Sequence, residues 1–201
     1  MTIHCANINR KGPTFSESDR ELLQKHGNQI YSKSHNLIRY ALTREELESY
    51  LDVIPEVKPY LLDFCVSKTK LLMLHIHTGP KHTIINCYIE TGDERTTFWE
   101  GEIVHDDTWV TDNGNGYWNV DYKILKPAQS YIAQEGEMWI LNPFSPHSVL
   151  PDLGPELEMI DRMINMDFQI RRYKRRVNRR LVQMYFDLTP EEAVEKLNVQ
   201  L

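Results

Sequence analysis

Short runs of β-branched and aromatic residues, separated by turn residues, follow one another from about Lys68 to Phe168. Several runs alternate apolar and polar positions, which is the pattern of strands with one buried face. The segment Asp112–Gly116 reads DNGNG, and residues that tolerate positive φ favour a tight hairpin there. Many short strands with turn signals between them are typical of an all-β sandwich or barrel. The middle of the chain is therefore predicted to be a β structure.

The pattern before this region favours helices. Residues 19–31 place Leu22, Leu23 and Ile30 on one helical face. Thr43 and Glu46 form a capping box ahead of a helix that would end near Leu51, because hydroxyl and carboxylate each satisfy a free amide. We therefore predict that the N-terminal part is helical.

After Phe168 the pattern again favours helix. We predict one helix over residues 171–185 and a second that begins at Thr189, with proline in its first turn and a capping Glu192. The chain is thus predicted to be one mainly β domain of the α+β class. Its parts are a helical segment over 1–66, a double-stranded β-helix (jelly-roll, cupin-like) core over 67–169, and C-terminal helices over 170–201.

Length and charge narrow the class of protein. The chain has 201 residues, which suits one domain with a sizeable core. Its formal net charge of −6 argues against a dedicated nucleic-acid-binding protein. The exception is the stretch Arg171–Arg180, which carries seven positive charges in ten residues. We interpret this stretch as a solvated helix, with contact to nucleic acid or to an acidic partner as the alternative.

The sequence also bears on the compartment. No run approaches the roughly 18 apolar residues that cross a bilayer, and the first residues lack the apolar core of a signal peptide. Cys5, Cys65 and Cys87 are odd in number and widely spaced, which favours reduced thiols over a disulfide framework. We therefore expect a cytoplasmic protein that does not cross a membrane.

Candidate chemistry lies in two histidine clusters on predicted strands. His75 and His77 are two residues apart, so they point to the same face of one strand. His147 follows about 70 residues later and could come from a facing strand. A non-haem iron site needs two imidazoles and usually one carboxylate, with positions left open for co-substrate and oxygen. Arg162, on the last predicted strand, could hold the far carboxylate of a small diacid.

Other interpretations of these residues stay open. His77 and His147 could be ordinary polar strand residues. His75 could be a third ligand, which would make a three-histidine cupin site able to take another divalent metal. Arg162 could be a strand arginine paired with a nearby acidic residue such as Asp161 or Asp167.

Three segments resemble the aspartyl/asparaginyl β-hydroxylase family of Fe(II)/2-oxoglutarate oxygenases. They are the HTGP segment at 77–80 with the apolar TIINCYI after it, the segment from Gly136 to His147, and the segment 162–167. The similarity covers about Leu71 to Phe168. It implies that His77 and His147 bind Fe(II), and that glycine, here Gly79, stands where other oxygenases place a carboxylate.

The resemblance also implies a site for the co-substrate. Arg162, with Asn86 or Tyr88, would hold 2-oxoglutarate. Asn86 stands where the family has an arginine, and the loop between His147 and Arg162 is longer than the family's. The segments 84–89 and 96–100 are similar to short oxygenase-like proteins of tailed phages, which suggests a bacterial or phage-infected cell as the setting.

We therefore predict a 2-oxoglutarate-dependent dioxygenase acting as a hydroxylase. The alternatives are a catalytically inactive jelly-roll protein with a structural or binding role, and a three-histidine cupin metalloprotein indifferent to 2-oxoglutarate. The prime substrate, a protein side chain or a small molecule, is not indicated by the sequence. Exposed sheet edges would allow a homodimer.

Overall fold

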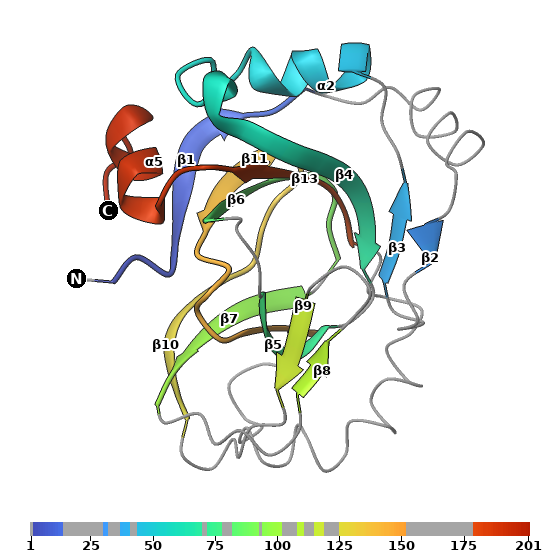
Figure 1. Cartoon of the computed structure of the whole chain (residues 1–201), viewed down its shortest axis with the longest axis vertical. Helices are drawn as coiled ribbons and strands as arrows, with labels where there is room; N and C mark the ends of the chain where they lie inside the picture. The colour runs from blue at the N-terminus through green and yellow to red at the C-terminus, as the bar shows by residue number, and fades with distance from the viewer. Residues whose placement is uncertain are drawn as a thin grey trace.

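The computed structural model of the chain is mainly β (Figure 1). It describes residues 2–13, 30–31, 37–40, 44–69, 72–77, 82–92, 94–101, 108–110, 115–118, 125–151 and 179–201. The helices in this part are α2 (Arg44–Leu51), the 3-10 helix η1 (Lys58–Tyr60) and α5 (Pro190–Lys196). No helix among the described residues combines the length and apolar character needed to span a membrane.

Two antiparallel sheets make up the β structure. The first has seven strands, in the spatial order β1 (Cys5–Lys11), β11 (Glu137–Leu141), β6 (Thr83–Glu90), β13 (Arg179–Phe186), β4 (Leu61–Thr69), β3 (Leu37–Tyr40) and β2 (Ile30–Tyr31). The second has six, in the order β10 (Lys126–Tyr131), β7 (Glu94–Glu100), β12 (His147–Pro151), β5 (Leu72–His77), β9 (Asn115–Trp118) and β8 (Thr108–Val110). Figure 1 shows β4, β6, β11 and β13 above β5, β7, β9 and β10.

Strands that follow one another in the sequence mostly alternate between the sheets. The chain passes from β4 in the first sheet to β5 in the second, then to β6 and to β7; after β10 it passes to β11, β12 and β13 in the same alternating way. Strand β13 consequently pairs with β4 on one side and with β6 on the other, far from either in sequence.

Alternation along β6 separates two cores. Ile85 and Cys87 belong to the core on the outer side of the first sheet, together with apolar residues of α2 and α5. Ile84 and Tyr88 point the opposite way and pack with Phe98 of β7, so they lie between the two sheets. A strand buried on both faces reads as a continuous apolar run, which is how TIINCYI reads.

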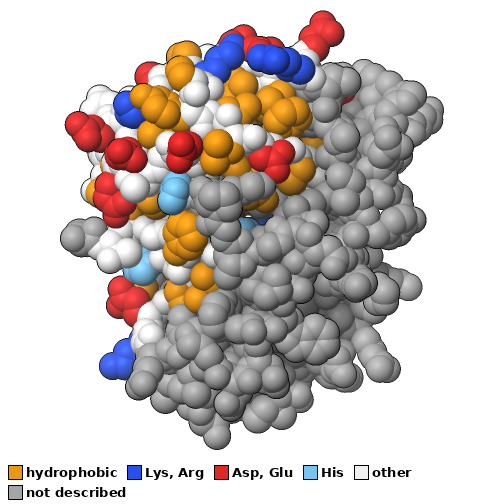
Figure 2. Space-filling view, viewed as in Figure 1, with side chains coloured by type: hydrophobic (Ala, Val, Ile, Leu, Met, Phe, Trp, Pro, Cys, Tyr) orange, Lys and Arg blue, Asp and Glu red, His pale blue; other side chains and the backbone are white. Residues whose placement is uncertain are grey.

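Helix α2 lies above the first sheet and α5 lies beside β1 (Figure 1). On the face shown in Figure 2, hydrophobic side chains gather in the upper part, where Figure 1 places α2 and β4, and charged side chains surround them. The capping of α5 confirms the prediction from sequence: Thr189 accepts from the amide of Glu192, the Glu192 carboxylate accepts from the amide of Thr189, and Pro190 is in the first turn.

Several predicted helices are strands instead. The helix predicted over 171–185 is wrong from Arg179 onward, because Arg179–Phe186 form strand β13 in the middle of the first sheet. Seven of its eight residues are buried, since both faces of the strand are covered. Arg179 and Arg180 are therefore not part of a solvated basic helix; the rest of Arg171–Arg180 lies outside the described residues.

The helical segment predicted over 1–66 is also wrong in large part. Strand β1 occupies Cys5–Lys11, and β4 begins at Leu61. Of the helix predicted over 19–31, only Ile30–Tyr31 is described, and these residues form β2. The helix predicted to end near Leu51 is present as α2, although Thr43 lies outside the described residues.

Candidate metal centre

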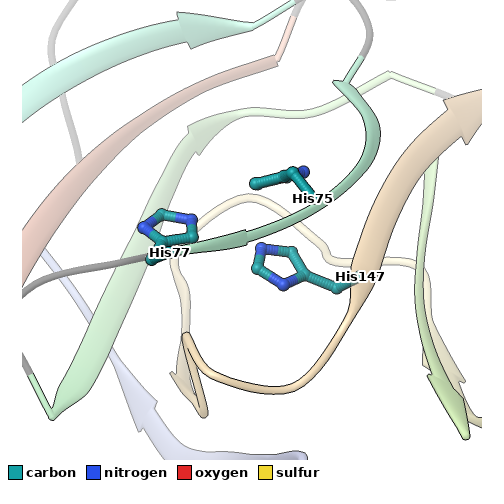
Figure 3. Close-up of side chains that lie close together, drawn as sticks. All are labelled: His75, His77 and His147. Atoms are coloured by element: carbon teal, nitrogen blue, oxygen red, sulfur yellow. The ribbon is translucent and has the colours of Figure 1, made fainter. Parts of the chain in front are cut away.

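Three histidines from two neighbouring strands meet in the second sheet (Figure 3). His75 and His77 lie on β5, and His147 is the first residue of β12. In the antiparallel ladder of β12 and β5, His147 stands directly opposite His75. The two-residue period of β5 then places His77 beside this pair. Strand register therefore brings together imidazoles that are 70 residues apart in the sequence.

The three rings are close enough to share one ion. One nitrogen from each of His75, His77 and His147 lies within 4.8 Å of the others. The ring centroids of His75 and His147 are 4.1 Å apart, and that of His77 is 5.1 Å from His75 and 5.2 Å from His147. Two nitrogens that each bond one ion at about 2.1 Å are roughly 3 Å apart. Small ring rotations would therefore close the cluster onto a metal.

The protonation of His147 suits a metal ligand. Burial lowers the pKa of His147 well below its usual 6.5, the neighbouring His75 lowers it further, and the charge of Arg179 acts in the same direction, against a hydrogen bond to Ser145 that raises it. The ring is therefore neutral at pH 7. Its Nδ1 lies 2.8 Å from the carbonyl oxygen of Ser145, which can only accept. Nδ1 must carry the proton, and Nε2 keeps its lone pair for a metal.

The cluster has a buried side and an open side. His75 and His147 are 2% and 6% exposed, whereas His77 is partly exposed. Among the described residues no aspartate or glutamate joins the three histidines. The donor set is thus three imidazoles, which suits iron, zinc, copper or nickel better than magnesium or calcium.

Polar residues of the first sheet face the space between the sheets. Asn86 shares a face of β6 with Tyr88; it is 3% exposed, and its Oδ1 has no hydrogen-bond partner in the described part of the chain. The hydroxyls of Tyr88 and Tyr131 are 2.7 Å apart. Burial raises the pKa of Tyr131 well above 10, so the Tyr131 hydroxyl stays protonated at pH 7.

Arg179 reaches into the same space from β13. Arg179 is 4% exposed; its guanidinium donates from Nη1 to Thr96 Oγ1 at 3.0 Å and lies 5.5 Å from the centre of the Tyr88 ring. Its Nε has no partner, and among the described residues no carboxylate forms an ion pair with it. A buried cation without a counter-charge is unfavourable, so this position favours the binding of an anion.

The structure brings together some of the residues that the sequence singled out. His77, His147 and His75 converge, and Asn86 and Tyr88 lie on the facing sheet. Arg162 and Gly79 lie outside the described residues. Arg179 was missed, because it belongs to the basic run Arg171–Arg180, which has the composition of a solvated helix. The apolar run after it, LVQMYF, was the signal that a two-sided strand begins there.

The chain was compared with protein families, curated proteins and solved structures. No family model matches the chain, and no curated protein matches it. Among solved structures, the chain is similar to the X-ray structure of E. coli ycfD, with 11% sequence identity and a TM-score of 0.46. The match covers 86% of this chain and 45% of that one, so the chain spans less than half the length of that protein.

Proposed function

We propose that the chain is an Fe(II)/2-oxoglutarate-dependent oxygenase in which His75, His77 and His147 bind the metal. The observation that carries this proposal is the convergence of three imidazoles in one sheet, with a buried guanidinium that reaches in from the other and has no carboxylate partner among the described residues. A metal site and an anion site between two sheets are what a metal-dependent enzyme with a dicarboxylate co-substrate requires.

Strand order supports a double-stranded β-helix as the scaffold. Eight strands divide into two sets of four neighbours, β11-β6-β13-β4 in one sheet and β10-β7-β12-β5 in the other. Successive members of this series lie in opposite sheets, except where the chain passes from β7 to β10. Such a path winds a pair of antiparallel strands into a roll, which is the jelly-roll arrangement.

His75 takes the place of the carboxylate that usually completes such a site. Three neutral imidazoles leave the double positive charge of a ferrous ion uncompensated, and half of an octahedral coordination shell open. An anionic co-substrate is then attracted more strongly than at a site with a carboxylate ligand. When bound, ferrous iron would let dioxygen, the oxidant, act on both molecules: 2-oxoglutarate would lose CO2 and take one oxygen atom to become succinate, and a second substrate would take the other.

Arg179 holds the far carboxylate of the co-substrate in this proposal. The sequence suggested Arg162 for this role, but Arg179 is buried, has no carboxylate partner in the described part of the chain and lies close to Tyr88. Its planar guanidinium can bind a carboxylate through two hydrogen bonds. Asn86, whose Oδ1 has no partner among the described residues, and Tyr88 line the same space and could donate or accept hydrogen bonds there.

An anaerobic titration tests this proposal. Fe(II) and then 2-oxoglutarate are added, and a charge-transfer band in the visible is expected for the wild type and absent in His77→Ala and His75→Ala. Succinate release in air should require the same residues. Arg179→Gln should bind Fe(II) normally and 2-oxoglutarate at least tenfold more weakly, because a charge-assisted hydrogen bond contributes about 1.5–3 kcal/mol. The absence of a band, together with equal behaviour of wild type and His77→Ala, would contradict the proposal.

The all-imidazole cluster favours one other function, a three-histidine metalloprotein that does not use 2-oxoglutarate. No described carboxylate joins the ligands, which is a feature of such sites. This alternative predicts the same loss of metal in the histidine variants but no spectral response to 2-oxoglutarate and no effect of Arg179→Gln.

A further inference from the structure

The loop Asn142–Pro146, between β11 and β12, contacts both metal-binding strands through its backbone. The carbonyl oxygen of Pro143 accepts from the amide of His77 at 2.9 Å. The carbonyl oxygen of Ser145 accepts from Nδ1 of His147 at 2.8 Å. That of Pro146 accepts from the amide of Trp99 on β7 at 2.9 Å. The position of this loop therefore sets the positions of His77 and His147.

The segment just before β1 holds this loop in place. The amide of Asn142 donates to the carbonyl oxygen of His4 at 2.8 Å, and its Nδ2 donates to that of Ile3 at 3.2 Å. The side chain of His4 makes a further contact, with its Nδ1 3.0 Å from Ser145 Oγ. On its other side, His4 Nε2 donates to Glu100 Oε1, also at 3.0 Å.

The groups on either side of His4 determine which of its ring nitrogens donates a hydrogen bond. A carboxylate only accepts, so Nε2 of His4 carries a proton, and in the neutral ring Nδ1 accepts from the Ser145 hydroxyl. His4 and Ser145 are largely buried, with the side chain of His4 12% and Ser145 6% exposed, while the Glu100 side chain is 65% exposed. The chain of contacts thus runs from the surface inward to the residue whose carbonyl orients His147.

We infer that His4 is a positioning residue for the metal centre, acting through Ser145 on His147. The inference rests on the proposed function, because it assigns a role toward the metal. Ser145 makes both contacts: its hydroxyl is hydrogen-bonded to Nδ1 of His4, and its carbonyl oxygen accepts from Nδ1 of His147. Loss of His4 frees Ser145 and lets the ligand ring rotate. Partners of this kind change metal affinity by about 10–100-fold.

Titration with Co(II) alone, followed by its visible absorption, tests this role in the full-length chain. His4→Ala and Ser145→Ala should each weaken Co(II) binding by about tenfold. The double variant should be no weaker than either single one, because both remove the same contact. His4→Asn places an amide where Nδ1 stands, so it should restore the affinity, whereas His4→Gln should not.

The control is His82→Ala. His82 is half exposed, and its ring centre lies 6.0 Å from that of Phe144, a residue of the loop Asn142–Pro146. Among the described residues, the His82 side chain makes no hydrogen bond to this loop. This variant should bind Co(II) as the wild type does. Thermal unfolding of each apo variant shows whether it is folded.

The outcomes separate the two proposals. If the wild type binds no Co(II), the proposed function fails. If the wild type binds it and folded His4→Ala binds with the same affinity and spectrum, the role of His4 is overturned while the metal site stands. A lower melting temperature in His4→Ala with unchanged Co(II) affinity would likewise show that His4 is only structural.

Discussion

Arg179 carries a charge that folding alone gives no reason to bury. Arg179 is 4% exposed, and its one hydrogen bond to a described residue goes to the neutral hydroxyl of Thr96. The face of the Tyr88 ring offers some compensation, since a cation above a ring gains about 1–2 kcal/mol. That is less than the several kcal/mol that desolvation of an ion costs. A residue that lowers stability in this way is expected where a ligand is bound.

Replacement of Arg179 by methionine tests this trade-off. Arg179→Met should leave the free energy of unfolding of the apo protein unchanged or raise it by about 1 kcal/mol, because the unpaired charge is removed while apolar volume is kept. Affinity for 2-oxoglutarate should fall at least tenfold. Urea unfolding and the anaerobic titration measure the two effects.

Arg180→Met is the matched control. Arg180 is the next residue of β13, points to the opposite face and lies 3.6 Å from Glu90. The Arg180→Met variant should bind 2-oxoglutarate with the same affinity as the wild type. A loss of about 3 kcal/mol or more in Arg179→Met would argue that Arg179 has a counter-charge in the folded protein, and so against a free anion site.

Among individual site residues, the histidines could be predicted best from the sequence. The period of a strand places His75 and His77 on one face whatever the fold, so their proximity could be predicted locally. Their meeting with His147 depends on the register of β12 against β5, which no local pattern encodes. The family resemblance implied His77 as a metal ligand, with His75 only a possible third one. In the structure, one nitrogen from each of the three rings lies within 4.8 Å of the others, so all three can be ligands.

Among the elements, β13 shows why the C-terminal part was mispredicted. A strand paired on both edges and covered on both faces has no polar face, so it lacks the alternation by which strands are recognised. The basic residues before it favour helix by propensity. Tertiary pairing with β4 and β6 outweighs that preference, because it buries Leu181, Val182 and Met184 completely.

The end of β1 is packed tightly against β6. The amide of Gly12 donates to the carbonyl oxygen of Gly136 at 2.8 Å, and a Cβ on Gly12 would overlap Sγ of Cys87. Burial raises the pKa of the Cys87 thiol to about 12, so this group is a neutral packing atom at pH 7.

Gly12→Ala should therefore lower the free energy of unfolding by about 1–3 kcal/mol, the usual cost of overpacking. Cys87→Ala makes room, so adding it to Gly12→Ala should recover part of the loss, as measured by urea unfolding of the four proteins in a double-mutant cycle. Strictly additive effects would contradict the predicted overlap.

A second contact of β1 makes stability depend on pH. Arg10 donates from Nη1 and Nη2 to the two carboxylate oxygens of Glu56, each at 2.8 Å, and so joins β1 to the segment after α2. Hydrogen bonds from Arg10 lower the pKa of Glu56 below its usual 4.5 in the folded protein. The contribution is therefore present above about pH 4.5 and is lost as the pH falls through the folded-state pKa.

Glu56→Gln should destabilise the protein by about 0.5 kcal/mol at pH 7, because the pair is partly exposed and screened. Near pH 3 the difference from wild type should disappear, and 1 M salt should reduce it at pH 7. Urea unfolding at both pH values measures this, with exposed Glu45→Gln on α2 as the control. A difference that grows on acidification would contradict the predicted sign.

In the whole molecule, the chain passes repeatedly from one sheet to the other, and these passages bring the residues of the site together. His75 and His77 come from β5, His147 from β12 and Arg179 from β13, and each of these strands is preceded by a strand of the other sheet. The short strand-like runs predicted a mainly β fold, which the two antiparallel sheets confirm. The strands β1 and β4 were missed because the strands that pair with them are distant in sequence, and β13 was missed because the basic residues before its apolar run favour helix.

Anomalous diffraction from crystals grown anaerobically with Fe(II) can show whether the three imidazoles bind one metal ion. We expect a single iron peak per chain, roughly 2.1 Å from one nitrogen each of His75, His77 and His147. The same crystals of His75→Ala should lack it. A peak elsewhere, no peak at all, or an ion bound by two of the rings with His75 turned away would contradict the account.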